Sequence, residues 1–444
     1  MEKKLQVGFA RVDITPEQYT NLGGLGDDAH RMCQVVRDHI FGSCVAITDT
    51  NGETMLFCPS DIIHARSCLS TPAREAISEA TGIPFDHIMI NASHNHSGPS
   101  TSSPHLETVQ IWFKHYIKQM VKCAKEALAD RKPATVLMGR GCAPDMNYDR
   151  HYITNDGILA TGGPKYPCEK HILGNDEIFQ LVKFQREGGR DVLLVNWQCH
   201  VTDCSATPSD RFVMTADYVG VLRNELEGQL GCHFAFFQGA AGNLVPNSRI
   251  ASENVREVHD YHTYGKDLAA YIIDALNDLQ PAKAGDVKVA KYTFEEEVDH
   301  TDDHLAEKAR YVRDHYFDFP TNKEKYDFVR EHGFNSYLHA NGVAHRASYD
   351  PGETICIDIC ALSCGDFSFI CAPYEMFCSS GQFIKDNTPF PMTFVVTCCN
   401  NTYDYMADNT IFDYDVYEVN TRRFARGAAE RLAQHFVDLL HELK

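Results

Sequence analysis

Residues 91–99 read NASHNHSGP, and the rest of the chain is organised around this stretch. The residues before it, 87–90 (HIMI), form an apolar run that predicts a short buried strand. If that strand continues to residue 96, His94 and His96 project from the same face. Two imidazoles side by side at a strand end suit metal ligation or polarisation of a bound carbonyl. The alternative is a pair of hydrogen-bonded loop histidines, and the His-x-His spacing alone does not separate the two.

Composition and charge exclude several classes of protein. The chain has 444 residues, a length that could hold two or three ordinary domains or one large α/β catalytic domain. Of these residues 43% are hydrophobic, which is enough for a substantial core. Its formal net charge is -20 and its pI is about 5.5. Nucleic acid and anionic membrane surfaces would be repelled by this charge, so neither is expected as the main partner.

The sequence also predicts the compartment. No stretch approaches 18 consecutive apolar residues, so we expect no transmembrane segment. The first residues, MEKKL, lead directly into a strand-like segment, without the apolar core of a signal peptide. Seventeen cysteines are scattered without the spacing of a disulfide framework. We therefore expect reduced thiols, buried as small hydrophobes, in a cytoplasmic protein.

Alternating strand and helix patterns predict an α/β protein with mixed β-sheets built from hairpins and flanked by helices. Hairpins are expected at 44–58, around Asn51-Gly52, at 177–200 and at 354–373. Further strands are expected near 7–12, 134–139, 234–237, 287–298 and 393–397, and helices from about 70, over 106–130, from 217, over 252–279 and from 422. Residues 301–347 are strongly polar and helical in pattern, which predicts an insertion that borders the site.

The central stretch resembles a known signature. Residues 93–99, SHNHSGP, are similar to the Thr-His-Thr-His-Ser-Gly-Pro signature of the neutral (non-lysosomal) ceramidases, which are zinc amidases. Further landmarks of that family have counterparts in the same order: RVDITP at 11–16, NYDR at 147–150, NWQCH at 196–200, GNLVPN at 242–247, PYE at 373–375, and TYDY at 402–405 followed by YE at 417–418. The resemblance covers residues 6 to about 440. It implies one ceramidase-like catalytic domain over 1–444, without the immunoglobulin-like C-terminal domain of the ceramidases.

The resemblance also implies a site. Zinc would be held by His94, His200, Glu375 and Tyr405, with Tyr403 as a competing choice for the tyrosine. His96, Arg150 and Tyr417 would hydrogen-bond the substrate carbonyl or the developing oxyanion, and His96 is the first candidate for the proton acceptor. Independently of the resemblance, the glycine-rich turn at Gly242 and Asn243 follows a strand, so its backbone N–H groups could approach a substrate oxygen.

One position departs from the family. The ceramidases carry Gly-Asp-x-Ser-Pro-Asn, with the serine proposed as nucleophile, and Val245 stands in its place here. A valine cannot attack a carbonyl, which excludes an acyl-serine route through this position. We therefore expect a zinc-dependent hydrolase in which a metal-bound water cleaves the amide bond of a small N-acylated substrate. The alternatives are an esterase or lactonase with the same zinc site, or a binding protein that kept the fold and lost the chemistry.

Overall fold

A computed structural model describes residues 4–444, except 27, 158, 162–167, 206–207, 248, 252–255 and 259. Its largest sheet has the strand order β14-β12-β11-β6-β1-β3-β4-β5, with β18 also paired to β6. These strands are β1 Gln6–Asp13, β3 Phe41–Thr48, β4 Thr54–Ser60, β5 Ile88–Ala92, β6 Lys132–Cys142, β11 Ile178–Arg186, β12 Val192–Trp197, β14 His233–Gln238 and β18 Gln280–Ala282. Most neighbours are antiparallel, but β4 with β5 and β12 with β14 are parallel pairs, so the sheet is mixed.

A second sheet lies against the first. Its order is β19-β20-β21-β23, formed by β19 Val287–Glu297, β20 Thr354–Cys364, β21 Phe367–Cys371 and β23 Met392–Val396. Aromatic residues from both sheets meet between them: the rings of Phe57 and Phe369 have centroids 4.3 Å apart, and those of Phe237 and Phe394 5.8 Å apart. The predicted hairpin turns at 51–52 and 365–366 join antiparallel strands, as expected.

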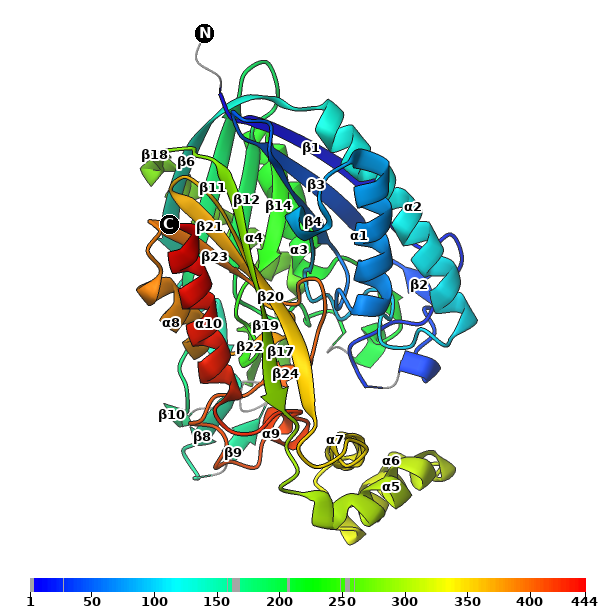
Figure 1. The fold of residues 1–444 in the computed structure, drawn as a ribbon. Coiled ribbons are helices and arrows are strands. Elements are labelled where there is room, and N and C mark those ends of the chain that lie inside the picture. The colour runs from blue at the N-terminus through cyan, green and yellow to red at the C-terminus, as the bar shows by residue number, and fades with distance from the viewer. Residues whose placement is uncertain are drawn as a thin grey trace.

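Helices cover the two outer faces. These helices are α1 Ser67–Thr81, α2 Glu107–Ala129, α3 Asp217–Leu230 and α4 Tyr261–Ala275 on the large sheet, and α8 Cys378–Asn387 and α10 Ala428–Leu443 on the small one. The order helix, sheet, sheet, helix is visible in Figure 1. It explains why β4 is buried on both faces: Leu56 and Cys58 pack toward the helices, whereas Met55 and Phe57 pack between the sheets.

Residues 301–347 fold as helices, as expected from their sequence. They form α5 Ala306–His315, α6 Asn322–Glu331 and α7 Tyr337–Arg346, which share a small apolar core and project at the bottom of Figure 1. The three helices connect β19 to β20, and these two strands pair along their full length. The helical segment is therefore an excursion from one long hairpin.

Short strands complete the fold around the ends of the two sheets. They are β2 Val35–Val36, β7 Asn147–Asp149, β8 His151–Thr154, β9 Leu159–Thr161, β10 Cys168–His171, β13 Val213–Met214, β15 Leu244–Pro246, β16 Arg249–Ala251, β17 Arg256–Val258, β22 Glu375–Met376 and β24 Tyr405–Met406, with the one-turn helix α9 at Tyr417–Asn420. Among the described residues, no helix is both long and apolar enough to cross a membrane. The sixteen cysteines whose side chains are described are free thiols.

The α/β class with mixed sheets is confirmed, but several predicted boundaries are wrong. The helix expected over 252–279 begins only at Tyr261, where Asp260 caps it through the backbone N–H groups of His262 and Thr263. The C-terminal helix begins at Ala428 rather than 422, after Gly427 adopts a φ of 91°. A side-chain cap marks the first of these helix starts, whereas the second follows the left-handed Gly427 without a side-chain cap.

Candidate active site

The loop that follows β5 brings His94 and His96 together in a way that differs from the sequence expectation. The strand ends at Ala92, and His94 has a φ of 64°, so the two histidines do not share a strand face. The left-handed conformation of His94 costs free energy and is held by neighbouring backbone bonds, from Ser93 N–H to the Ser60 carbonyl and from His96 N–H to the Val201 carbonyl. The Nε2 atoms of His94 and His96 nevertheless lie 3.1 Å apart.

His200 joins this pair from the end of β12. Its Nδ1 lies 2.7 Å from the Ala241 carbonyl oxygen and 2.9 Å from that of Leu244. The Nδ1 of His94 likewise lies 3.1 Å from the Ile63 carbonyl oxygen. A ring nitrogen beside a carbonyl oxygen must carry the proton, so in the neutral tautomer each Nε2 keeps its lone pair. Both Nε2 atoms are thereby available as ligands.

Glu375 and Tyr405 reach the same point from two strands. β22 and β24 are parallel, and their register places Glu375 beside Tyr405. One carboxylate oxygen of Glu375 lies 3.2 Å from His94 Nε2 and 3.5 Å from His200 Nε2. Neither contact has hydrogen-bond geometry, so this buried oxygen is grouped with the imidazole nitrogens without being hydrogen-bonded to them. The Tyr405 hydroxyl lies 3.2 Å from His200 Nε2.

Tyr403, the competing tyrosine, lies elsewhere. Its hydroxyl donates to the Cys356 carbonyl at 2.9 Å, and its side chain does not border the cavity described below. Of the two tyrosines, only Tyr405 therefore takes part in the cluster.

The charges in the cluster are coupled through Glu375. Burial opposes its ionisation, but His94, His200 and His64 outweigh that effect and hold its pKa well below the usual range. Burial also opposes the charge on His94, but Glu375 raises the pKa of His94 to about 10. Burial and the neighbouring His94 lower the pKa of His96 well below its usual value and that of His200 to about 4. One anionic carboxylate thus faces mostly neutral imidazoles, which is a donor set suited to a divalent cation.

The residue types fit zinc. Ligand nitrogens of His94, His96 and His200 lie within 4.8 Å of one another, and all three residues are buried. His94 and His200, with the Glu375 carboxylate and the Tyr405 hydroxyl, form a mixed nitrogen and oxygen set of the kind that zinc accepts. The backbone carbonyls behind His94 and His200 supply the outer hydrogen bonds that orient metal-binding imidazoles.

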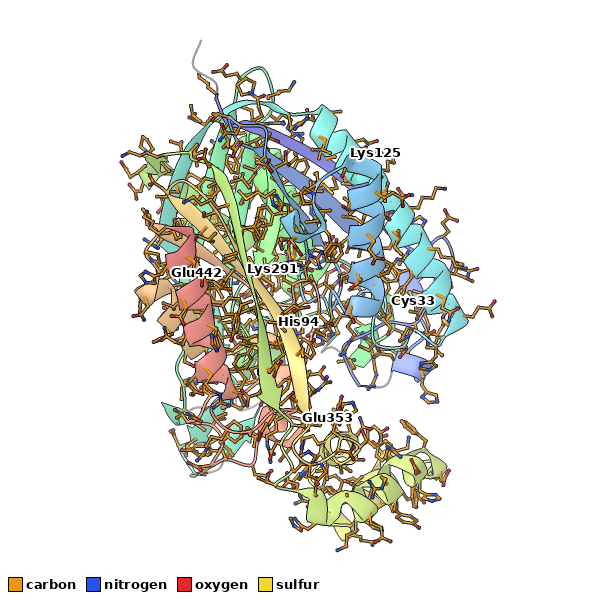
Figure 2. All side chains as sticks on the ribbon, viewed as in Figure 1. Cys33, His94, Lys125, Lys291, Glu353 and Glu442 are labelled. Atoms are coloured by element: carbon orange, nitrogen blue, oxygen red, sulfur yellow. The ribbon has the colours of Figure 1, made fainter. Side chains whose placement is uncertain are left out.

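A cavity of about 780 Å³ opens over this cluster. It is bordered by all seven predicted metal and catalytic residues: His94, His96, Arg150, His200, Glu375, Tyr405 and Tyr417. Figure 2 labels His94 near the centre of the view, and its side chain is buried. Val245 also borders the cavity, so an apolar side chain stands in the wall at that point. Leu338 and Gly342 of α7 also border the cavity, so the helical excursion does border the site.

Arg150, between β7 and β8, is held in place by an ion pair and a hydrogen bond within the protein. It forms an ion pair with the fully buried Glu418, and one Nη donates to the Gly242 carbonyl at 2.9 Å. His151 Nε2 lies 2.7 Å from the other carboxylate oxygen of Glu418. Glu418 was not predicted as a site residue, and its position immediately after Tyr417 was the available signal.

Gly242 and Asn243 lie behind the cavity wall rather than in it. The Gly242 N–H donates to the Met376 carbonyl at 2.7 Å. The Asn243 side chain accepts from the Cys378 N–H at 2.9 Å, and its carbonyl accepts from the Arg150 N–H at 2.9 Å. In this structure the turn positions Arg150 and the start of α8.

Comparison with solved structures identifies the architecture. The neutral ceramidase from Pseudomonas aeruginosa superposes with a TM-score of 0.74 over 100% of this chain and 75% of that chain, at 15% sequence identity. A structure of ceramidase complexed with C2 gives the same TM-score and coverage at 14% identity. The chain has a neutral ceramidase fold. No protein-family model and no curated protein sequence matches it.

The ceramidase-like fold contains one further site residue that sequence reasoning missed. His64 follows β4, and its Nε2 lies 3.1 Å from the second carboxylate oxygen of Glu375. It is buried and borders the cavity. The only signal in the sequence was a histidine directly after an apolar pair, in DIIH at 61–64, at the end of an expected strand.

Proposed function

We propose that this protein is a zinc-dependent hydrolase that cleaves the amide bond of a small N-acylated substrate. The observation that carries the proposal is the convergence of His94, His200, Glu375 and Tyr405 at the base of one cavity, on a neutral ceramidase fold. Hydrolysis adds the oxygen of water to the acyl carbon, breaks the carbon–nitrogen bond and leaves a carboxylic acid and an amine.

The proposed ligands are these four residues. Bound zinc supplies a Lewis acid that polarises a carbonyl and lowers the pKa of water. The chain contributes orientation: backbone carbonyls hold the rings of His94 and His200, and His64 holds the Glu375 carboxylate from its other oxygen.

His96, Arg150 and Tyr417 are the proposed catalytic residues. His96 is neutral near pH 7 because burial lowers its pKa, so it can donate one N–H to the carbonyl oxygen. Arg150 keeps its charge beside Glu418, and its guanidinium borders the cavity as a hydrogen-bond donor. The Tyr417 hydroxyl borders the cavity and is a further donor, since a tyrosine hydroxyl is protonated near pH 7.

The attacking oxygen comes from water in this proposal. Val245 places no hydroxyl at the position where the ceramidases have their serine, and it borders the cavity here. A direct attack by water needs no covalent acyl intermediate.

The function is tested with zinc-loaded protein and a panel of small N-acyl amides and their matched esters. Release of the carboxylic acid is followed by chromatography, before and after treatment with a chelator and after zinc is restored. We expect zinc-dependent cleavage of amides. Cleavage of esters or lactones alone would identify an esterase or lactonase, and zinc binding without any cleavage would leave a binding protein; either outcome contradicts the proposal.

A further inference from the structure

Two arginines in the cavity wall share a single carboxylate. Arg66 Nη2 donates to one oxygen of Asp404 at 2.9 Å, and Arg423 Nη2 donates to the other at 3.1 Å. Among the residues that the structure describes, Asp404 is the only carboxylate within 4.0 Å of either guanidinium. All three side chains border the cavity and are partly exposed to it. One positive charge of this Arg66–Arg423 pair is therefore left uncompensated.

The other arginines of the wall are balanced. Arg150 is paired with Glu418, and Arg422 is paired with Asp299 and with Asp302, at 2.9 Å from the latter. Arg346, behind the wall, also pairs with Asp302 at 2.9 Å, so two arginines there face two carboxylates. The excess positive charge is thus confined to the Arg66–Arg423 pair.

That excess stands out against the charge of the whole chain. The formal net charge is -20, so an anionic molecule is repelled from most of the surface. The remaining carboxylate of the wall, Asp28, accepts a hydrogen bond from Ser100 at 2.6 Å, and burial raises its pKa. A cavity with local positive charge in a low-dielectric wall concentrates the field and selects an anionic group.

Arg66 and its partner Asp404 are close in the sequence to residues of the proposed metal site. Arg66 is two residues after His64, which contacts Glu375. Asp404 precedes Tyr405, and its carbonyl accepts from the Glu375 N–H at 2.9 Å. Arg66, Arg423 and Glu375 all border one cavity, so an anionic group held by the two arginines would share that cavity with the proposed metal site.

We propose that the Arg66–Arg423 pair binds a carboxylate of the substrate, and that the substrates are N-acyl amino acids. This inference rests on the proposed amide hydrolysis and specifies its substrate class. The carboxylate of an N-acyl α-amino acid is separated from the amide nitrogen by one carbon, so both groups would occupy the one cavity that the arginine pair, Glu375 and Tyr405 border. Guanidinium groups bind carboxylates with two parallel hydrogen bonds, and both arginines have N–H groups beyond those given to Asp404.

The test compares N-acetylglycine with its neutral amide, N-acetylglycinamide, by the rate of acetate release. Charge-assisted hydrogen bonds predict that the wild-type protein prefers the carboxylate by about 10- to 100-fold in kcat/KM. Arg423→Gln should reduce this preference to about threefold or less, because the rate on the carboxylate falls more than the rate on the neutral amide. Arg426→Gln is the matched control, because Arg426 pairs with Asp413 outside the cavity and its loss should change neither rate.

A binding measurement separates this inference from the proposed function. N-methylsulfonylglycine keeps the carboxylate but has no amide bond to cleave, and its affinity is measured by calorimetry on the wild-type, Arg423→Gln and Arg66→Gln proteins. Carboxylate-dependent binding that both substitutions weaken supports the site even if no amide is cleaved. Cleavage of the neutral amide without any preference for the carboxylate, or a preference that survives both substitutions, overturns the inference while leaving the function intact. Should one variant fail to fold by circular dichroism, the other variant and the wild-type preference still decide.

Discussion

A substitution at His96 shows whether this residue binds zinc or instead hydrogen-bonds the substrate carbonyl oxygen. Its Nε2 lies 3.1 Å from that of His94, and no described residue bonds its Nδ1. If His96 serves the carbonyl oxygen, His96→Ala should lower kcat by about 10²- to 10³-fold, as for other lost oxyanion donors. Zinc content, measured by atomic emission on the same samples, should stay at the wild-type level. Loss of zinc from this variant would make His96 a ligand and contradict the assignment.

The ionised carboxylate of Glu418, which pairs with Arg150 of the site, contributes to the free energy of unfolding. Burial raises the pKa of its carboxyl group, but Arg150 and His151 outweigh burial and lower the pKa to about 2, against an ordinary value of 4.5. Such a depressed pKa stabilises the folded state by about 3 kcal/mol above pH 4.5, and this contribution is lost as the pH falls toward 2. Glu418→Gln should therefore lower the free energy of unfolding at pH 7 by about that amount.

Unfolding measured at a series of pH values tests the contribution of the Glu418 charge to stability. Denaturant unfolding followed by fluorescence should show the difference between wild type and Glu418→Gln shrinking as the pH falls from about 4.5 to 2. Glu442→Gln, on the exposed end of α10, is the control and should be neutral at each pH. A constant difference across the series would mean that the carboxylate charge contributes nothing.

At the scale of elements, the sequence predicts strands and hairpins well and loop geometry poorly. Apolar runs identified β5, β12 and β14, because burial leaves a direct mark on composition. The left-handed conformation of His94 has no such signal in the sequence, since it depends on tertiary hydrogen bonds from Ser93 to Ser60 and from His96 to Val201. Two strands as short as β22 and β24 also have no periodicity, although their pairing is what places Glu375 beside Tyr405.

The order of strands was likewise beyond the sequence. β12 pairs in parallel with β14 through the crossover of α3, and β21 pairs in parallel with β23 through α8. The sequence predicted mixed sheets, but it assigned only the hairpin pairings within them. Of the site, the metal and catalytic residues that the family landmarks imply do border one cavity. His64 and Glu418 were missed because each acts through another side chain, on Glu375 and Arg150, rather than through a recognisable motif.

β15 carries Val245, at the position where the resemblance to the ceramidases would place a serine. β15 pairs with β7, with Val245 opposite Tyr148, and Val245 borders the cavity. The proposed attack by water is tested at this position. Stopped-flow measurements should therefore show no burst of the first product, and mass spectrometry of quenched reactions should show no acyl adduct. Ser248 lies outside the described residues; Ser248→Ala should keep near-normal activity. An acyl group trapped on any serine would show that the nucleophile has moved.

At the scale of the whole molecule, two sheets and their helices form layers, and the site lies where short strands connect their ends. We propose that residues 1–444 act as one catalytic domain. In this view 301–347 is an insertion that contributes α7 to the cavity mouth, with Leu338 and Gly342 in the wall. Gly342 is closely packed, since a Cβ there would lie 2.9 Å from the Asn420 carbonyl oxygen of α9, so the insertion and the wall that carries Tyr417 are in direct contact.

The zinc content of the purified protein is the most direct measure of whether this protein is a zinc-dependent hydrolase. We expect about one zinc per chain in the wild type, and loss of zinc together with activity in His200→Ala. Circular dichroism of that variant should remain close to wild type, because catalytic zinc contributes less to folding than structural zinc. An active, metal-free His200→Ala protein, or a wild type that binds no zinc, would contradict the account.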